Sequence, residues 1–336
     1  MKKITFYTSP FIQNKVFDLD DPIANINNFA YPHWKLKDSF FKNGYDLSTQ
    51  DINSTLSSEA IIYNDMPKSL PKADDINRSY LMLFECEIIK PRNWNLNSHK
   101  HFKKIFTWDD RYVDNKKYFK INFSHFIPET INKNILGKTK LCSLIAGNKK
   151  FSHKLELYSE RVKAIRWFEK NHPKDFDLYG VRWDEYRFGH GLLGKPLNKL
   201  KFLRKSGNYP SYKGKVNCKN KVLQNYKFAI CYENARDIPS YITEKIFDCF
   251  FAGCVPIYWG ANNITDYVPE NCFIDKRKFD TYEELYDFMV NMSDSDYVGY
   301  LDNIEKYIQS DQIKIFSADH FADVITTEIL NDITVK

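Results

Sequence analysis

A dense run of polar and charged side chains, "ENARDIPSYITEK", fills residues 233–245 between two apolar segments. The segment before it, "YKFAICY", is typical of a buried strand, and the segment after it, "IFDCFFAG", is typical of a helix. Thr243 suits the N-cap of that helix and Glu244 suits its first turn, whereas the cation of Lys245 is repelled by the free N–H groups there. A phosphate or diphosphate bound between Lys245 and the helix end would explain the pattern. An exposed lysine that tolerates a small penalty explains it equally well.

Neighbouring side chains could serve the same ligand. Asn234 and Tyr241 could form neutral hydrogen bonds with it, and Glu244 could accept from a ribose diol or stabilise a cationic sugar transition state. Glu233 ends the predicted buried strand and needs a partner there, which could equally be a structural ion pair. The chain contains neither a GxGxxG nor a GxxxxGK[ST] loop, so side chains and a helix end would hold any nucleotide. This pattern argues against dinucleotide oxidoreductases and P-loop NTPases.

Short apolar strands alternate with helical segments along most of the chain. In the first half we expect strands at "KKITFY", "SEAIIYND", "SYLMLFECE", "KKIFTW" and "KYFKINF". In the second half we expect strands at "TKLCSLIAGN", "FDLYG", "YKFAICYEN", "VPIYWG" and "CFIDK". Helical periodicity covers residues 155–171, 243–253, 281–292, 294–309 and 317–331, and Thr281 with Glu284 forms a capping box. Residues 11–56 show no clean period.

This alternation predicts two doubly wound α/β domains with a boundary near residue 138. Sheets of this kind bind ligands beyond the carboxyl ends of their strands. Glu85 and the 233–245 turn both follow predicted strands, so we expect them to face each other across a cleft between the domains.

The amino-acid composition indicates in which cellular compartment the protein works and which partners it binds. The seven cysteines show no CxxC pair and no zinc spacing, so we expect reduced, mostly buried thiols, a reducing compartment and no bound metal. No signal peptide or apolar stretch long enough to span a membrane is present, so we expect a cytoplasmic protein. Ten Lys or Arg and no Asp or Glu lie between residues 191 and 227, which leaves peripheral membrane contact open. We expect no nucleic-acid partner, because acidic residues such as Asp114 accompany the mixed basic and aromatic segment "RYVDNKKYFK".

The stretch "YKFAICYENARDIPSYITEKIFDCFFAGCVPIYWGA" resembles the donor-binding region of glycosyltransferase family 10, the α-1,3/4-fucosyltransferases, in their soluble bacterial or viral form. The family pattern of YKF, Glu-Asn, Tyr-(Val/Ile)-Thr-Glu-Lys and a later Pro and Gly matches in one contiguous run. Upstream, "SERVKAIRWF" and "LFECE" followed by "KIFTWDDRY" are similar to family segments in the same order. The resemblance spans roughly residues 80–280.

The resemblance implies a fold and a reaction. The fold would be of the GT-B type, with two Rossmann-like domains facing a cleft. Residues 1–138 would bind the acceptor and residues 139–336 would bind a GDP-sugar, with the last helix able to pack back on the first domain. The reaction would move L-fucose from GDP-fucose to a glycan hydroxyl, with inversion and without a metal or other cofactor. The expected acceptor is a GlcNAc unit, joined in α-1,3 linkage, on a lipopolysaccharide, a protein or a free oligosaccharide.

The resemblance also implies roles for single residues. Lys245 and Arg161 would neutralise the diphosphate leaving group. The nucleotide sugar would be positioned by the family's other matched residues, namely Asn234, Tyr241, Thr243, Glu244 and Glu233. Glu85 would act as the general base that deprotonates the acceptor. Glu87 is an alternative base, because residues two apart on a strand point the same way.

Some positions depart from the family pattern. Ala235 stands where many members have Ser, and the loop that holds Arg236 and Asp237 is longer than usual. Many members have Glu-Ser-Pro at the base, where this chain has Glu85-Cys86-Glu87. Two alternatives therefore stay open: a transferase that uses another GDP-hexose, and a non-catalytic module that binds nucleotide sugars or glycans.

Overall fold

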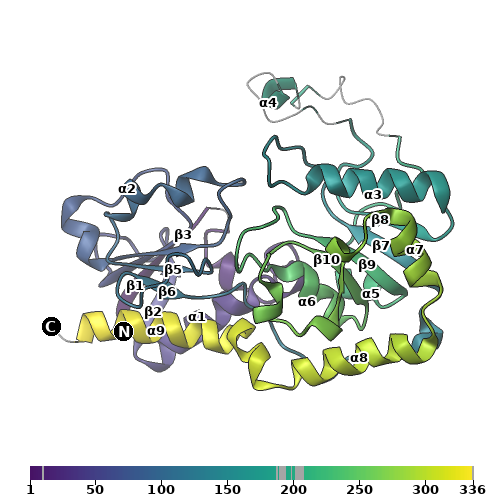
Figure 1. The fold of residues 1–336 in the computed structure, drawn as a ribbon. Helices are drawn as coiled ribbons and strands as arrows, with labels where there is room; N and C mark the ends of the chain where they lie inside the picture. The colour runs from purple at the N-terminus through teal and green to yellow at the C-terminus, as the bar shows by residue number, and fades with distance from the viewer. Residues whose placement is uncertain (10, 187, 189–193, 198, 201–207, 335–336) are drawn as a thin grey trace. The chain divides into compact units, whose positions relative to one another are not determined.

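The chain folds into two compact units, each built around one parallel sheet (Figure 1). The computed structural model describes residues 1–9, 11–186, 188, 194–197, 199–200 and 208–334. Unit 1 comprises Met1–Ile127, Pro239–Tyr241 and Ile313–Lys336, and unit 2 comprises Pro128–Ile238 and Ile242–Gln312. The units divide first after Ile127, whereas the sequence suggested a boundary near residue 138. Part of the basic stretch 191–227, including Lys201, Arg204 and Lys205, lies outside the described residues.

Unit 1 holds a six-stranded parallel sheet in the order β2-β1-β3-β4-β5-β6. Its strands are β1 (Lys2–Tyr7), β2 (Tyr45–Thr49), β3 (Ala60–Asn64), β4 (Ser79–Leu83), β5 (Lys104–Thr107) and β6 (Tyr118–Lys120). Its helices are α1 (Tyr31–Lys42), α2 (Leu96–His99) and α9 (Ala318–Thr334). All five strands predicted for this half are confirmed.

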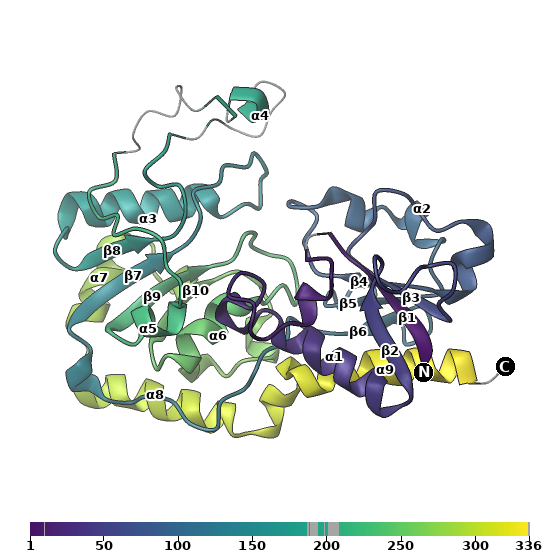
Figure 2. The same ribbon diagram turned by 180° about the vertical axis from the view of Figure 1, so that it is seen from behind.

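Side chains of the sheet in unit 1 alternate between two apolar clusters. Ile62 and Met82 point into the larger cluster, which α1 and α9 complete on one face of the sheet. Ile61 and Leu81, one residue earlier on the same strands, point into a smaller cluster on the other face. Both views show α9 running beside α1 (Figure 2). The terminal helix therefore closes the core of unit 1.

Two elements inside residues 11–56, α1 and β2, were not predicted. In α1 the buried residues are Pro32, His33, Leu36 and Phe40, so a proline and a histidine interrupt the apolar stripe. Its N-cap residue, Ala30, offers no capping side chain. β2 is an edge strand of sequence "YDLST" whose polar side chains hide its period.

Unit 2 holds a five-stranded parallel sheet in the order β11-β10-β9-β7-β8. Its strands are β7 (Lys140–Ile145), β8 (Phe176–Tyr179), β9 (Tyr226–Tyr232), β10 (Val255–Trp259) and β11 (Ile274–Asp275), and all five were predicted. Its helices are α3 (Tyr158–Asn171), α4 (Gly194–Leu197), α5 (Lys219–Leu223), α6 (Glu244–Phe251), α7 (Tyr282–Val290) and α8 (Asp294–Ile308). α3 and α7 pack together on one face of this sheet, and α5, α6 and α8 cover the other (Figure 1).

The order of the strands in unit 2 creates a reversal point. From β7 the chain passes through α3 to β8 at one edge of the sheet, and then returns to place β9 on the other side of β7. Open parallel sheets bind ligands at such a reversal, beyond the carboxyl ends of the two strands that flank it. The sheet therefore singles out the ends of β7 and β9.

The predicted capping box and the predicted free cysteines are both confirmed. The Thr281–Glu284 capping box is present at the start of α7, with both reciprocal hydrogen bonds formed. All seven cysteines are free thiols, and six of them are buried.

Candidate functional site

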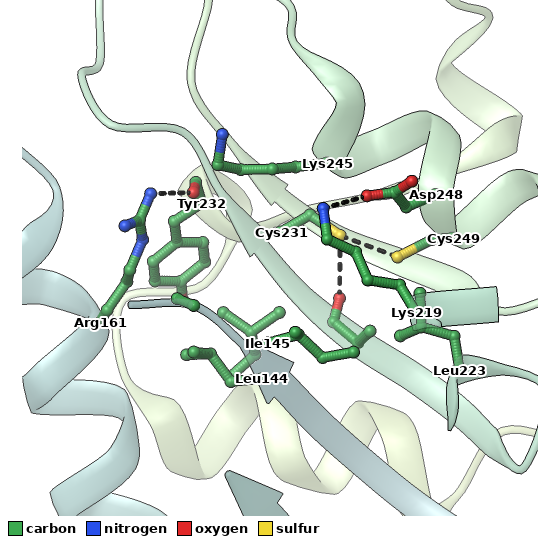
Figure 3. A pocket seen from close by; sticks show the side chains of 13 residues that line it. Leu144, Ile145, Arg161, Lys219, Leu223, Cys231, Tyr232, Lys245, Asp248 and Cys249 are labelled. Carbon is green, nitrogen blue, oxygen red and sulfur yellow. Dashed lines mark hydrogen bonds and ion pairs between the residues drawn. The ribbon is translucent and has the colours of Figure 1, made fainter. Parts of the chain in front are cut away.

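A pocket opens at the reversal point of the unit 2 sheet, between the carboxyl ends of β7 and β9 (Figure 3). It contains about 410 Å³ of empty space, including the open solvent at its mouth. Its walls come from the ends of these strands and from α3, α5 and α6, and four of its lining side chains are charged: Arg161, Lys219, Lys245 and Asp248. The thiols of Cys231 and Cys249 lie 3.1 Å apart on its wall. The pocket therefore combines an apolar interior with three cations and one anion.

Glu233 directly follows β9 and contacts Lys245, which lines this pocket. Its side chain is fully buried and accepts hydrogen bonds from the backbone N–H of Thr243 at 2.8 Å and from the Thr243 hydroxyl at 2.7 Å. The ammonium of Lys245 lies 3.1 Å from the same carboxylate and 2.8 Å from the Thr243 hydroxyl. Glu233 thus has the partners that a buried carboxylate needs, and it fixes the turn between β9 and α6.

Thr243 occupies the N-cap position of α6, as predicted, but its side chain does not cap the helix. Its hydroxyl donates to the Glu233 carboxylate instead of accepting from an N–H group of the first turn. A buried carboxylate is the stronger acceptor, because hydrogen bonds to charged groups are roughly twice as strong as neutral ones. The expectation of a capping side chain was therefore wrong.

Lys245 is neither exposed nor neutral. Only 19% of its side chain is accessible, which rules out the interpretation as an exposed surface lysine. Burial would lower the pKa of Lys245, but the negative charges of Glu233 and Glu244 outweigh burial and raise the pKa above its usual value. The carboxylate of Glu244 lies 3.4 Å from the Lys245 ammonium and is itself 43% exposed. Lys245 is therefore positively charged at neutral pH where it lines the pocket.

Arg161 brings a second cation to the pocket from the first turn of α3. It is buried, and its Nη2 atom donates to the Tyr232 carbonyl at 2.6 Å and to Asn234 Oδ1 at 3.0 Å. The backbone carbonyl of Asn234 in turn accepts from the N–H of Leu157, just before α3. These bonds tie the start of α3 to the end of β9. Five predicted donor-site residues thus form two adjoining groups: Arg161 with Asn234, and Glu233 with Thr243 and Lys245.

The pair of Lys219 and Asp248 was missed by the sequence reasoning. The Lys219 ammonium, from α5, lies 2.6 Å from the Asp248 carboxylate on α6 and 3.9 Å from Glu244. Burial alone would lower the pKa of Lys219, but Asp248 and Glu244 outweigh burial and raise it. The available signal was Asp248 itself, since a carboxylate inside the apolar run "IFDCFF" requires a buried partner.

Gly260 is required by close packing around Glu233. A Cβ atom at this position would lie 2.5 Å from the Glu233 Cγ and would collide with the Tyr258 hydroxyl. The Gly260 carbonyl also accepts from the N–H of Asp237 at 3.0 Å, which holds the loop after Glu233 against the end of β10. The absence of a side chain thus lets the Glu233 side chain fit.

Tyr241 does not line the pocket. It belongs to unit 1, where its ring is buried and lies 4.9 Å from the ring of Trp108 and 6.0 Å from that of Phe123. Its neighbour Ser240 hydrogen-bonds to Asp110 in the same unit. The segment Pro239–Tyr241 is therefore part of the core of unit 1.

Glu85 and Glu87 follow β4 in unit 1, but neither lies on a strand. β4 ends at Leu83, because Asp65 at the end of β3 accepts from the N–H of Phe84 at 2.8 Å and the chain then turns. Glu85 is half-buried, whereas Glu87 is exposed in the following turn. The expectation that the two carboxylates share one side of a strand was therefore wrong.

The backbone at Glu85 is held firmly. Its carbonyl accepts from the side-chain amide of Asn93 at 3.1 Å and from the indole N–H of Trp94 at 3.0 Å. The Trp108 indole fixes the preceding carbonyl, that of Phe84, at 2.8 Å. The backbone of Glu85 is therefore rigid, and a rigid backbone can hold the Glu85 carboxylate in a fixed position.

In the part of the chain that the structure describes, no group of three or more His, Cys, Asp or Glu side chains could hold a metal ion. Within the described ranges, no helix has both the length and the apolar character needed to cross a bilayer.

Part of the chain is similar in sequence to known fucosyltransferases. Residues 193–324 match the family model described as "Glycosyltransferase family 10 (fucosyltransferase) C-term". An alpha-(1,4)-fucosyltransferase of Arabidopsis thaliana is 35% identical over 113 residues, which are 31% of this chain and 28% of the relative. An alpha-(1,3)-fucosyltransferase of Helicobacter pylori is 37% identical over 75 residues, which are 22% of this chain and 15% of the relative. The aligned parts thus span less than a third of the length of these curated relatives.

A solved structure extends the similarity to the whole fold. The crystal structure of an alpha1,3-fucosyltransferase with GDP-fucose aligns with 98% of this chain and 91% of its own, with a TM-score of 0.55 and 16% identity. At that identity the alignment concerns the fold, which is the expected GT-B arrangement of two parallel-sheet α/β domains.

Proposed function

We propose that this chain, a member of glycosyltransferase family 10, transfers L-fucose from GDP-fucose to a hydroxyl of a glycan acceptor, with inversion at the sugar carbon. The observation that carries the proposal is the convergence of Arg161 and Lys245 on one pocket at the reversal point of the unit 2 sheet. One buried and one partly buried cation at such a point suit the diphosphate of a nucleotide sugar. No metal is needed in this mechanism, because the two side chains supply the positive charge.

The surroundings of Lys245 support its role toward the leaving group. Its three N–H donors face the Glu233 carboxylate, the Thr243 hydroxyl and, at the longest distance of 3.4 Å, the carboxylate of Glu244. A phosphate oxygen that displaced Glu244 would gain a charge-assisted hydrogen bond without disturbing the buried partners. Glu244, half-exposed, would then be available to the ribose or the sugar.

Glu85 is the proposed general base on the acceptor side. Its carboxylate would take the proton of the acceptor hydroxyl as that oxygen bonds to the fucose carbon. The bond from this carbon to the GDP oxygen breaks at the same time, and its electron pair leaves with GDP. Attack opposite the leaving group inverts the configuration. Glu87 remains the alternative base, although its exposure makes a fixed geometry harder to maintain.

The relatives support the donor more directly than the acceptor. The similar proteins carry names of alpha-(1,4)-, alpha-(1,3)- and protein O-fucosyltransferases, so they share fucose and differ in what receives it. We propose an α-1,3 linkage to GlcNAc on this chain. We also place the activity in a reducing compartment such as the cytoplasm, because its cysteines are free and mostly buried.

Purified protein, GDP-fucose and a panel of GlcNAc-containing acceptors test the proposal. We expect GDP-fucose to raise the melting temperature, and transfer to continue in the presence of a chelator. Glu85→Gln should lose at least 100-fold in kcat while it still binds GDP-fucose, and Glu87→Gln should retain most of the activity.

Other results of these experiments would contradict or modify the proposed function. If GDP-fucose neither binds nor shifts the melting temperature, the proposal fails. Donor binding without turnover by the unmodified protein identifies a non-catalytic binding module, and faster turnover with another GDP-hexose corrects the donor sugar.

A further inference from the structure

Unit 1 contains a second hollow, which the donor chemistry does not use. It is an open groove between α1 and the segment around the 3-10 helix η1 (Lys15–Phe17), with about 880 Å³ of empty space. Its walls carry the rings of Phe17, Trp34 and Phe41. The groove lies within residues 11–56, where the sequence showed no clean pattern. We name it the α1 groove.

The aromatic side chains of the α1 groove follow from helical spacing. Trp34 and Phe41 are seven residues apart on α1, so they lie on one face, beside the stripe of Leu36 and Phe40 that enters the core. Phe17 is buried and forms the floor, whereas Phe41 is 63% exposed at the rim. A large exposed aromatic side chain beside a concave surface is typical of a binding site rather than of a core.

Trp34 is held in place by its own neighbour. Its ring stacks on that of Tyr31 at 5.8 Å with an angle of 29° between the planes, and the ammonium of Lys35 lies 5.8 Å from both rings. A ring fixed in this way loses little conformational freedom when a ligand stacks on it. Trp34 therefore offers a rigid flat surface to the groove.

The polar groups of the groove define the ligand further. Asp18 and Asp38 provide carboxylates, which accept hydrogen bonds from hydroxyl groups, and Asp38 also pairs with the Lys42 ammonium at 2.7 Å. The one lining cation, Lys37, is bound to Asp46 and to the Ser48 hydroxyl at 3.2 Å each and lies over the Phe17 ring. A phosphate would meet two carboxylates and only cations that already pair with Asp46 and Asp38. A wholly apolar ligand would leave the carboxylates desolvated. Neutral rings with one apolar face and several hydroxyl donors fit best, and pyranose sugars have this form.

One wall of the α1 groove reaches the same edge of the sheet as Glu85. Asn14, on its wall, accepts from the N–H of Thr49 at 2.8 Å, at the carboxyl end of β2. Glu85 follows the carboxyl end of β4, and β1 and β3 lie between the two strands in the sheet. Adjacent strands are separated by about 4.7–4.9 Å, so about 14 Å separates β2, to which the groove wall is hydrogen-bonded, from β4, which precedes Glu85. That span is longer than one sugar and suits an oligosaccharide.

We propose that the α1 groove binds uncharged sugar units of an oligosaccharide acceptor at a distance from the unit that reacts. The binding of sugars in the groove is independent of the reaction, and only the identity of the reacting end rests on the proposed function. The groove would favour longer acceptors over single sugars, because each further unit reaches more aromatic surface.

Calorimetric titration of the full chain without GDP-fucose tests this directly. The probes are the monomer, dimer and tetramer of β-1,4-linked N-acetylglucosamine and lactosamine-type oligosaccharides of the same lengths. We expect the tetramers to bind at least tenfold more tightly than the monomers. Trp34→Leu and Phe41→Leu should each weaken tetramer binding about five- to tenfold, which corresponds to the loss of one aromatic stacking contact.

Three comparisons make the test selective. Trp34→Phe should retain most of the tetramer affinity, since it keeps an aromatic face. Phe29→Leu removes an aromatic ring that is 50% exposed and lies outside the groove, and should change nothing. GDP binding, measured in parallel, should be the same in all variants, and matching far-UV circular dichroism spectra report that the variants are folded.

The outcomes separate this inference from the proposed function. Tetramers that bind no better than monomers, tetramer binding that Trp34→Leu and Phe41→Leu leave intact, or preferential binding of a sulfated oligosaccharide would overturn it. A protein that binds tetramers in the groove but does not bind GDP or GDP-fucose retains the inference and loses the proposed function.

Discussion

The carboxylate of Glu233 lies 3.1 Å from the ammonium of Lys245, at the turn where β9 passes into α6. Glu233 is fully buried, whereas the side chain of Lys245 lines the pocket. The pair therefore joins a structural role to a ligand-binding role. Glu233 holds the turn in place, and it also keeps Lys245 charged where a diphosphate would bind.

Glu233→Gln should lower the free energy of unfolding by about 3 kcal/mol, because it leaves the buried ammonium of Lys245 without its charged partner. Urea unfolding measures this change. Glu244→Gln is the matched control, since its carboxylate is 43% exposed and should contribute less than about 1 kcal/mol. Equal effects of the two substitutions would show that the Glu233–Lys245 pair does not stabilise the turn.

The Lys219–Asp248 pair allows a double-mutant cycle. Lys219→Met should destabilise the protein by about 3–5 kcal/mol, because the buried carboxylate of Asp248 loses its partner at 2.6 Å. Adding Asp248→Leu should recover most of that loss, since both charges are then removed together. Urea unfolding of the parent, the two single variants and the double variant gives the coupling energy. Additive losses would mean that the two charges do not stabilise each other.

Two glycine substitutions should change stability in opposite directions. Gly260→Ala places a Cβ against Glu233 and Tyr258 and should destabilise the protein by about 1–3 kcal/mol. Gly299→Ala lies within α8, where no atom is within 4 Å of the added Cβ, and should stabilise by about 0.5–1 kcal/mol. Melting temperatures measured side by side provide the comparison. A neutral Gly260→Ala would contradict the tight packing around Glu233.

His33 should make the stability of the protein depend on pH. It is buried among aromatic rings of unit 1, its Nε2 has no hydrogen-bond partner among the described residues, and burial lowers its pKa to about 4 despite a contact with the Phe29 carbonyl. Above about pH 6.5 both the folded and the unfolded states carry neutral imidazole. As the pH falls from 6.5 to 4, only the unfolded state gains the proton, so stability is lost.

The full loss corresponds to about 3 kcal/mol, reached below pH 4. His33→Phe should therefore show a flatter profile of unfolding free energy between pH 6.5 and 4 than the parent protein. The exposed His153→Gln serves as the control and should follow the parent. If His33→Phe retains the parent's slope, other groups cause the acid sensitivity.

The predictable parts of the fold were those determined by local sequence. Ten strands were found because short apolar runs between polar segments identify buried parallel strands, whatever their neighbours. α1 and β2 were missed because their stability comes from packing with α9 and β1 rather than from a clear local period. Their sequences carry a proline, a histidine and polar residues at positions where a simple pattern would place apolar ones.

The candidate site shows the same division. Arg161, Asn234, Glu233, Thr243 and Lys245 could be singled out because unusual residue types cluster near strand ends. The hydrogen bonds that these residues form could not be predicted. The Thr243 hydroxyl, for example, donates to a carboxylate ten residues away instead of accepting from an N–H group of its own helix. The end of β4 before Glu85 depends on Asp65 of another strand, and the partner of Asp248 is supplied by α5. One sequence can show that a residue such as Asp248 needs a partner, but it does not show which distant segment supplies that partner.

The segment Pro239–Tyr241 has a consequence for how the protein can be dissected. Three residues of unit 1 are inserted in the chain of unit 2, and the C-terminal helix returns to unit 1, so the chain passes between the units four times. No single cut therefore yields two complete fragments. A fragment that ends at Ile127 would lack α9, which completes its larger apolar cluster, and Tyr241, which packs on Trp108. Each unit is therefore built from segments that are separated in the sequence by parts of the other unit.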